Sequence, residues 1–379
     1  MDNPWGLGVG NWESFGNWEL AVGNSRRHTS CKCLRLVPTI AANADRWTKH
    51  DWVGRGDEWS PGGSHAGTDL LWWRTLLPRI RTLLPARRIL EIGPGYGRWT
   101  DYLRTSCEHL IAIDVTPACI ESCRERFAGD PRLEFHVNDG TSLDAAGTGS
   151  VDFVFSFDSL VHAEGDVLDR YVEQFARILA PDGAVFVHHS NLGAFVDPET
   201  HDVQPYVTKR HWRATSMTAR RMRDAARRAG LECVTQELIN WIGRGRTADR
   251  PRLEGRALPL TDCLSIVMRP IGDGPADTRI LCNRTFVDEW RQTLSLAAIY
   301  TRRAHEGSAV TPAPAGPRRR SDVLKERAHK ELAGRMFVRL DPIAPALRAR
   351  RCPDCRTTMT TIGGRTSSCA HCQTQWSLL

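Results

Sequence analysis

The sequence lacks an apolar run long enough to span a membrane, since its longest apolar stretches, such as Val151–Phe157, have only the length of a strand. Met1–Trp5 contains no basic stretch leading into an apolar run, so we expect no secretory signal and a cytoplasmic protein. Apolar residues at 41% and charged residues at 25% are typical of a globular chain. In the cytosol, the 12 cysteines indicate thiols or metal ligands rather than disulfides.

Positive charge is concentrated near the C-terminus. Residues 302–351 hold 13 Lys and Arg and 5 Asp and Glu, whereas the whole chain has a net charge of only +7. This stretch includes Thr311–Pro317, which is rich in proline, and we predict a linker over residues 301–350. A solvated tether is favoured over a nucleic-acid surface, because Phe337 is the one Phe, Tyr or Trp among the charges of this stretch, too little aromatic interleaving to support base stacking. The arginines of 220–228 are interpreted as a solvated helix face.

Four regions follow from the patterning: a Trp/Gly-rich segment at 1–46, a main domain at 47–300, the linker, and a small unit at 351–379. The main domain alternates strands with amphipathic helices, which predicts an α/β, Rossmann-like sheet of seven mostly parallel strands covered by helices on both faces. The predicted strands are Ile89–Ile92, Leu110–Ile113, Leu133–Val137, Val151–Phe157, Ala184–His188, Leu231–Leu238 and Cys263–Met268. Such sheets bind ligands at the carboxyl ends of their strands, where the strand order reverses.

The stretch Ile89–Arg98 places Gly93, Gly95 and Gly97 between a predicted strand and a predicted helix. Glycine allows a tight turn and a close approach of the backbone to a ligand. The spacing is G-x-G-x-G rather than the dinucleotide pattern G-x-G-x-x-G. Glu91 stands just before the turn, where it can answer the ammonium group of an amino acid. Asp114 closes the next strand and can accept hydrogen bonds from ribose hydroxyls.

A ligand with both a nucleoside and an amino acid fits these residues better than a pyrophosphate does. The sequence here resembles the class I S-adenosylmethionine-dependent methyltransferases. This resemblance implies a donor site on the glycine turn, with ribose on Asp114 and the adenine amino group near Asp139. It also implies that the residues after the fourth strand border the donor and face the acceptor. The implied donor-binding residues are Glu91, Gly93, Pro94, Gly95, Gly97, Asp114, Asn138, Asp139, Gly140 and Phe157.

Four further segments, Gly56–Ser60, Phe155–His162, His188–Asn191 and His211–Ala214, resemble a narrower bacterial group that methylates sugar hydroxyls. This implies a glycan or another sugar-containing acceptor. An alcohol becomes a good nucleophile only when a base removes its proton during attack, and histidine is suited to this near neutral pH.

The candidates for this base are histidines and an aspartate that follow two of the strands. We predict His162 as the base, with His189 and Asp158 as the other candidates. Mg²⁺ held by Asp158 with Asp139 or a neighbouring histidine is an alternative, but no clustered carboxylate motif supports it, and base catalysis without metal is favoured.

The end of the chain contains the pattern C-x2-C-x13-C-x2-C. Two close thiolate pairs suit tetrahedral Zn²⁺, and four cysteines leave no open position, so we predict a structural zinc ribbon. The ligands would be Cys352, Cys355, Cys369 and Cys372. A unit of this size depends on its metal to fold, and it can serve to contact a protein partner, nucleic acid or the main domain itself.

The leading hypothesis is therefore a sugar O-methyltransferase. An RNA methyltransferase recruited through the zinc ribbon and basic linker is the main alternative. A methyltransferase acting on a phenol or carboxylate stays open, as does a non-catalytic binding module, although the complete set of donor residues argues against the latter.

Overall fold

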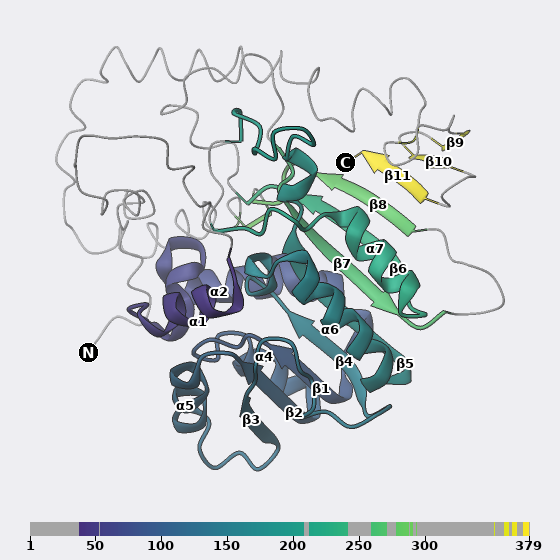
Figure 1. Ribbon diagram of the computed structural model, residues 1–379. Coiled ribbons are helices and arrows are strands. Elements are labelled where there is room, and N and C mark those ends of the chain that lie inside the picture. Colours follow the sequence, from purple (N-terminus) through teal and green to yellow (C-terminus); the bar gives the residue numbers. More distant parts are fainter. Residues whose placement is uncertain are drawn as a thin grey trace, which may run out of the picture.

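The computed structural model describes residues 38–52, 54–207, 212–241, 259–270, 278–287, 289–290, 293, 352, 360–363, 366–369 and 374–378 (Figure 1). Its helices are α1 (Ile40–Thr48), α2 (His65–Leu71), α3 (Leu77–Ile80), α4 (Thr100–Leu103), α5 (Pro117–Arg126), α6 (Gly165–Ile178) and α7 (Ala219–Arg228). Its strands are β1 (Ala86–Ile92), β2 (Cys107–Asp114), β3 (Leu133–Val137), β4 (Val151–Ser156), β5 (Leu179–Ser190), β6 (Glu232–Ile239), β7 (Asp262–Met268), β8 (Thr278–Asn283), β9 (Thr360–Gly363), β10 (Thr366–Cys369) and β11 (Thr374–Leu378). None of the described helices is long and apolar enough to cross a membrane.

The described strands form one sheet in the order β3-β2-β1-β4-β5-β7-β6-β8-β11-β10-β9. The first five in this order are parallel, β7 is antiparallel to both β5 and β6, and β8 is parallel to β6. The first eight strands therefore make a mostly parallel, Rossmann-like α/β sheet, which confirms the predicted fold class. The strand order reverses between β1 and β4, because β2 and β3 lie on one side of β1 and β4 and β5 lie on the other. Such folds bind ligands at this position.

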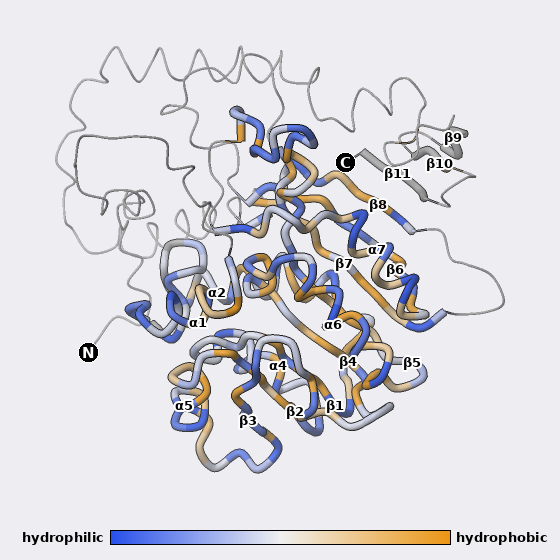
Figure 2. Tube along the Cα trace, in the orientation of Figure 1, coloured by the Kyte–Doolittle hydropathy of each residue, from blue (hydrophilic) through white to orange (hydrophobic). Residues whose placement is uncertain are grey.

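Helices cover both faces of this sheet, as predicted. On one face α6 and α7 lie side by side (Figure 1), and Val172 and Phe175 of α6 belong to the same apolar cluster as Val185 of β5. On the other face Leu71 and Trp99 join a second cluster with the central strands. Figure 2 shows the apolar residues concentrated on those strands, while α7 carries many hydrophilic residues. Burial of these two apolar layers holds the strand ends in fixed positions.

Two sequence predictions need correction in detail. The sheet has an eighth strand, β8, where only seven were predicted, because Thr278–Asn283 carries polar residues at both ends and shows no clear strand pattern. The fifth strand, predicted over Ala184–His188, begins earlier: α6 ends at Ile178 and β5 starts at Leu179, so Pro181 lies inside a strand. The pairing of β4 with β5 shifts register between Val151 and Phe153, and such irregularities tolerate a residue without an N–H.

The C-terminal strands pack against the main domain rather than standing apart. β11 pairs in parallel with β8, from Thr374 opposite Thr278 to Leu378 opposite Cys282, and β10 and β9 follow antiparallel. Cys352 and Cys369 are buried in one cluster with Leu238, Cys263 and Cys282 of the main domain. The edge that β8 would present is thus covered by the chain's own C-terminal segment.

Candidate functional site

The glycine turn predicted from the sequence connects β1 to α4. Gly93, Gly95 and Gly97 all have positive φ, at 73°, 56° and 81°, which side chains rarely adopt. A Cβ at Gly93 would lie 1.9 Å from Ser159 Oγ, and one at Gly97 would lie 2.5 Å from a ring carbon of Phe127. Buried Pro94 accepts a hydrogen bond from the N–H of Gly97 at 3.0 Å. The turn therefore requires glycine for both conformation and space.

Glu91 is buried on β1, with only 1% of its surface exposed. Its Oε2 accepts a hydrogen bond from Thr100 Oγ1 at 2.6 Å, while the buried Oε1 has no hydrogen-bond partner among the described residues. Burial raises the pKa of this carboxyl to about 7. An unsatisfied buried oxygen of this kind fits a cationic ligand group, such as the ammonium of an amino acid.

Asp114 closes β2 beside the turn. Its Oδ2 lies 3.3 Å from the N–H of Gly95, and its Oδ1 accepts a hydrogen bond from the N–H of Thr116 at 2.9 Å. Burial raises the pKa of this carboxyl, although the backbone donors oppose the shift. A carboxylate has about four lone-pair sites, so Asp114 retains acceptor capacity for ribose hydroxyls.

The turn after β3 is formed by Asn138, Asp139 and Gly140. Asp139 is exposed, and its Oδ1 accepts hydrogen bonds from the N–H groups of Thr141 and Ser142, both at 2.7 Å, which lower the pKa of the carboxyl. The buried Oδ1 of Asn138 has no hydrogen-bond partner among the described residues. The turn thus offers acceptor oxygens to a ligand amino group.

Asp158 follows β4 with a left-handed backbone conformation, φ 62°. Its N–H donates to Nδ1 of His188 at 3.2 Å, and its carboxylate lies 3.1 Å from the guanidinium of Arg98. Arg98 also donates to Ser60 Oγ at 3.3 Å. A non-glycine residue in this conformation costs of the order of 1 kcal/mol, so these partners must hold it.

His188 in turn contacts a buried ion pair. Its Nε2 lies 3.4 Å from Asp262 Oδ2, and Asp262 receives two hydrogen bonds of 2.7 Å from the guanidinium of Arg213. His188 and Asp262 are both fully buried. The adjacent guanidinium and His188 hold the pKa of the Asp262 carboxyl well below its usual range, against the opposing effect of burial. Since Nδ1 of His188 accepts a hydrogen bond, the ring proton belongs on Nε2, facing Asp262.

His162 lies on a short turn that follows β4, with 9% of its surface exposed. Its Nδ1 is 2.9 Å from the carbonyl oxygen of Trp212, so Nδ1 carries the proton and Nε2 has a lone pair. Burial, together with the charge of Arg213, lowers its pKa to about 4. The ring is consequently neutral near pH 7 and able to accept a proton through Nε2.

Residues 89–183 match a family described as "Methyltransferase domain". The demethylmenaquinone methyltransferase of Clavibacter sepedonicus is 29% identical over 123 residues, which are 32% of this chain and 48% of that protein. The ribosomal RNA small subunit methyltransferase A of Geobacter sulfurreducens is 37% identical over 81 residues, which are 21% of this chain and 29% of that protein. The match to the domain family includes the whole glycine turn, Glu91, Asp114 and the turn after β3.

This segment of the chain is therefore similar to methyltransferases. A solved S-adenosylmethionine-dependent methyltransferase from Mesorhizobium loti aligns over 54% of this chain and 100% of its own, at 16% identity and a TM-score of 0.39. The chain spans less than half the length of the two curated relatives.

The two other base candidates make contacts that differ from those of His162. His189 is fully buried, and both ring nitrogens are engaged, Nδ1 with Ser190 O at 2.9 Å and Nε2 with Ser265 Oγ at 2.8 Å. Asp158 is paired with Arg98. No hydrogen bond engages His162 Nε2 among the described residues, in contrast to both ring nitrogens of His189.

Phe157 follows β4 and is buried. Its ring packs against those of Trp99, His188 and Trp241, at centroid distances of 5.7, 4.7 and 5.8 Å. Within the described residues, no group of three or more potential ligands could hold a metal ion. Cys355 and Cys372 lie outside the described residues, so the predicted zinc ligands are not all placed.

Sequence reasoning missed several residues of the site. The four segments that resemble sugar methyltransferases meet around Asp158: Ser60 contacts Arg98, His188 contacts Asp158, and Trp212 contacts His162. Arg98, directly after the glycine turn, was not predicted to join them. Trp52 lies outside the Trp/Gly-rich segment at 1–46, and no local pattern indicated that it contacts the glycine turn.

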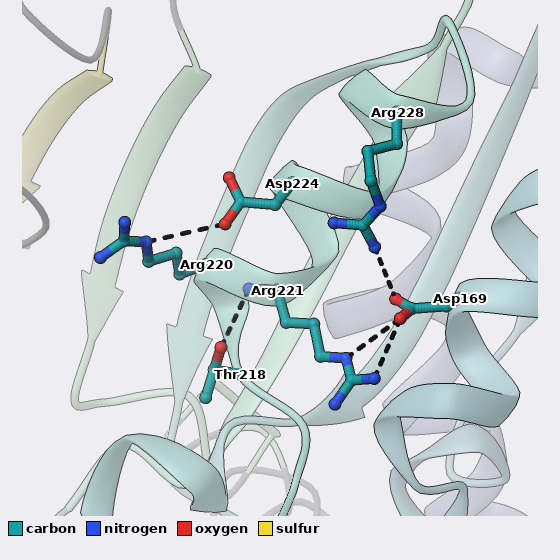
Figure 3. A pocket seen from close by; sticks show the side chains of 6 residues that line it. All are labelled: Asp169, Thr218, Arg220, Arg221, Asp224 and Arg228. Atoms are coloured by element: carbon teal, nitrogen blue, oxygen red, sulfur yellow. Dashed lines mark hydrogen bonds and ion pairs between the residues drawn. The ribbon is translucent and has the colours of Figure 1, made fainter.

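A solvent-facing hollow between α6 and α7 is not part of this site (Figure 3). Arg221 and Arg228 pair with Asp169, and Arg220 pairs with Asp224, so these arginines already have carboxylate partners. This agrees with a solvated helix face, with one correction. Arg223 is 3% exposed and hydrogen-bonds to the buried Gln236 on β6.

Proposed function

We propose that the chain transfers the methyl group of S-adenosylmethionine to a hydroxyl of a sugar-containing acceptor. The observation that carries the donor assignment is the buried, unsatisfied Oε1 of Glu91 beside a turn that requires three glycines. Glu91 would hold the ammonium, Asp114 the ribose and the turn after β3 the adenine. The likeness of residues 89–183 to methyltransferase domains supports this arrangement.

When bound, the donor supplies an activated methyl group on a positive sulfur. The protein must then orient the acceptor oxygen in line with that methyl group and take up one proton. His162 Nε2 is proposed to accept the hydroxyl proton as the new O–C bond forms and the S–C bond breaks, and to release it to solvent afterwards. Its neutral ring and fixed tautomer suit this role.

A sugar is the favoured acceptor because aromatic rings stand beside hydrogen-bonding groups at this edge of the sheet. Trp241 lies 5.8 Å from Phe157 and 6.2 Å from His188 between ring centroids, and Asp158 and Arg98 add polar groups. Product analysis with labelled S-adenosylmethionine and a panel of glycosides, phenols and carboxylates tests this proposal. Labelled methyl ethers on glycosides are expected, whereas label confined to phenols or carboxylates would reject the sugar assignment.

The second candidate is an RNA methyltransferase, which is favoured by the likeness to a ribosomal RNA methyltransferase. It predicts RNA binding that weakens steeply with salt and is lost when residues 302–379 are removed. Labelling of RNA in the product analysis would favour this candidate.

Glu91→Gln is expected to weaken the binding of S-adenosylhomocysteine about 10–100-fold at pH 8, since a hydrogen bond to a charged group is lost. The wild-type affinity should fall as the pH is lowered through about 7, because the neutral carboxyl no longer attracts the ammonium. The stability of the fold changes with pH in the opposite direction. The pKa of Glu91 is raised on folding, so its contribution to stability is lost as the pH rises from 4.5 to about 7.

Isothermal titration from pH 6 to 8 and thermal melting of both proteins measure these two effects. Glu91→Gln should therefore melt higher than the wild type at pH 8 while binding the ligand more weakly. Glu108→Gln, at an exposed position of β2, is the matched control and should change neither quantity. Equal ligand affinity in the wild type and Glu91→Gln would show that Glu91 does not hold the ammonium.

We also propose that the four C-terminal cysteines bind one structural Zn²⁺. The burial of Cys352 and Cys369 in a single cluster beside β8 supports this. Metal analysis of the purified chain is expected to find about one zinc per molecule, and Cys352→Ser with Cys369→Ser should lose it. Cys107→Ser, outside the ribbon, should retain the zinc; a zinc-free wild type purified without chelator would contradict the proposal.

A further inference from the structure

Trp52 covers the glycine turn from outside the segment that matches the methyltransferase family. A Cβ at Gly95 would lie 2.9 Å from Trp52 Cη2. The Trp52 ring stacks on Tyr96 with centroids 4.9 Å apart and an interplanar angle of 11°. Its Nε1–H donates to the carbonyl oxygen of Trp47 at 3.2 Å, which ties the ring to the end of α1. Trp52 is therefore a flat wall held against the donor turn.

Ile40, at the start of α1, lies against the second donor element. A Cβ at Gly140 would lie 2.7 Å from Ile40 Cγ2 and 3.1 Å from Val115 Cγ1. Gly140 follows Asp139, and Val115 follows Asp114, so Ile40 stands between the ends of β2 and β3. The segment that contains Ile40 and Trp52 thus contacts the proposed donor site at Gly140 and at Gly95.

Asn43, one turn further along α1, links this segment to His162. Asn43 Nδ2 donates to the carbonyl oxygen of His162 at 2.9 Å, and Asn43 Oδ1 accepts from Trp212 Nε1 at 2.6 Å. His162 Nδ1 completes the ring of contacts by donating to the carbonyl oxygen of Trp212 at 2.9 Å. The Trp47 ring lies 5.3 Å from that of His162. One short helix therefore touches the donor site at Ile40 and the acceptor-side histidine at Asn43.

We propose that the segment from Ile40 to Trp52 is a wall shared by the two substrates: Ile40 and Trp52 bind the nucleoside donor, and Asn43 positions His162. An apolar side chain and a flat aromatic face suit a purine and a neighbouring cation. Because α1 is a continuous hydrogen-bonded helix, displacement of Ile40 by a bound donor moves Asn43 and with it the His162 ring. This inference rests on the donor assignment proposed above.

Isothermal titration with S-adenosylhomocysteine tests the donor wall. Trp52→Ala and Ile40→Ala are each expected to weaken binding about tenfold, equivalent to about 1.4 kcal/mol. Trp73→Ala is the matched control, because Trp73 is 60% exposed, and it should bind like the wild type. Trp52→Phe, which keeps an aromatic face, should recover most of the affinity if Trp52→Ala folds poorly. Wild-type or tighter affinity in both Trp52→Ala and Ile40→Ala would overturn the wall.

Nitrogen-15 spectra of the histidine rings test the coupling, with His162→Ala used only to assign the signals. In the wild type, S-adenosylhomocysteine should shift the His162 ring resonances while Nδ1 stays protonated. In Asn43→Ala, the His162 signals should differ already without ligand and should respond less to it. Unchanged His162 signals in the wild type on saturation would refute the coupling.

The titrations distinguish a failure of the donor assignment from a failure of the shared wall. A wild-type chain that shows no affinity for S-adenosylhomocysteine at all rejects the proposed donor. A wild-type chain that binds it, with Ile40 and Trp52 variants of equal affinity, rejects only the shared wall.

Discussion

Replacing His162 with alanine is expected to lower methyl transfer about 10²–10⁴-fold, the usual contribution of a positioned general base. The structure favours His162 because its tautomer is fixed by the Trp212 carbonyl and its pKa of about 4 keeps it neutral. The rate should therefore show no loss attributable to His162 between pH 6 and 8. The measurement is single-turnover methyl transfer to the acceptor that product analysis identifies.

Two other histidines provide controls for this prediction. His65→Ala, at a side chain that is 61% exposed, should retain wild-type turnover. His189→Asn should lose stability, because both ring nitrogens of His189 are hydrogen-bonded, but it should retain turnover per folded molecule. Near-normal turnover in His162→Ala would instead direct attention to Asp158.

Asp262→Ala is expected to lower the free energy of unfolding by about 3–5 kcal/mol, because it leaves the buried guanidinium of Arg213 without its counter-charge. Asp262 receives both hydrogen bonds from Arg213 and has no exposed surface. Loss of its contact with His188 should also release the left-handed Asp158. Urea denaturation monitored by circular dichroism measures the loss in stability.

The exposed ion pairs of α7 supply the control for this variant. Asp224→Ala removes a partner of Arg220 and Arg227, but Asp224 is 40% exposed, so the expected change is below about 1 kcal/mol. Comparable losses in the free energy of unfolding in Asp262→Ala and Asp224→Ala would show that the buried ion pair stabilises the fold no more than an exposed pair does. The lowered pKa of Asp262 adds a pH dependence: its stabilising effect is present above the ordinary value of 3.8 and is lost as the pH falls below it.

The glycine turn and the acidic residues beside it were readable from the sequence. The glycine spacing, Glu91 and Asp114 are local features, because a strand, a tight turn and a helix within one short segment determine where those groups lie. The alternation of apolar strands, such as Val151–Phe157, with amphipathic helices likewise predicted the layers of the fold. These patterns depend on neighbours in sequence, so no knowledge of distant contacts was needed.

The different surroundings of the neighbouring residues His188 and His189 could be known only from the pairing of the strands in the sheet. His188 and His189 are adjacent on β5, and side chains alternate between the two faces of a strand. The register with β7 sends His188 toward Asp262 and Asp158, and sends His189 toward Ser265. The local sequence does not show whether the side chain of His188 or that of His189 faces the proposed site.

The sequence by itself determined the α/β class, the glycine turn and its flanking acids, because these follow from short-range periodicity and backbone conformation. Only the tertiary structure decided that Trp52 stands over that turn, that Ile40 lies against Gly140 and that Asn43 contacts His162. It also decided that Arg213 and Asp262 support Asp158 through His188, and that the C-terminal strand covers β8. These contacts join segments far apart in the chain. Their formation depends on which apolar faces bury against each other, a choice that a one-dimensional pattern does not contain.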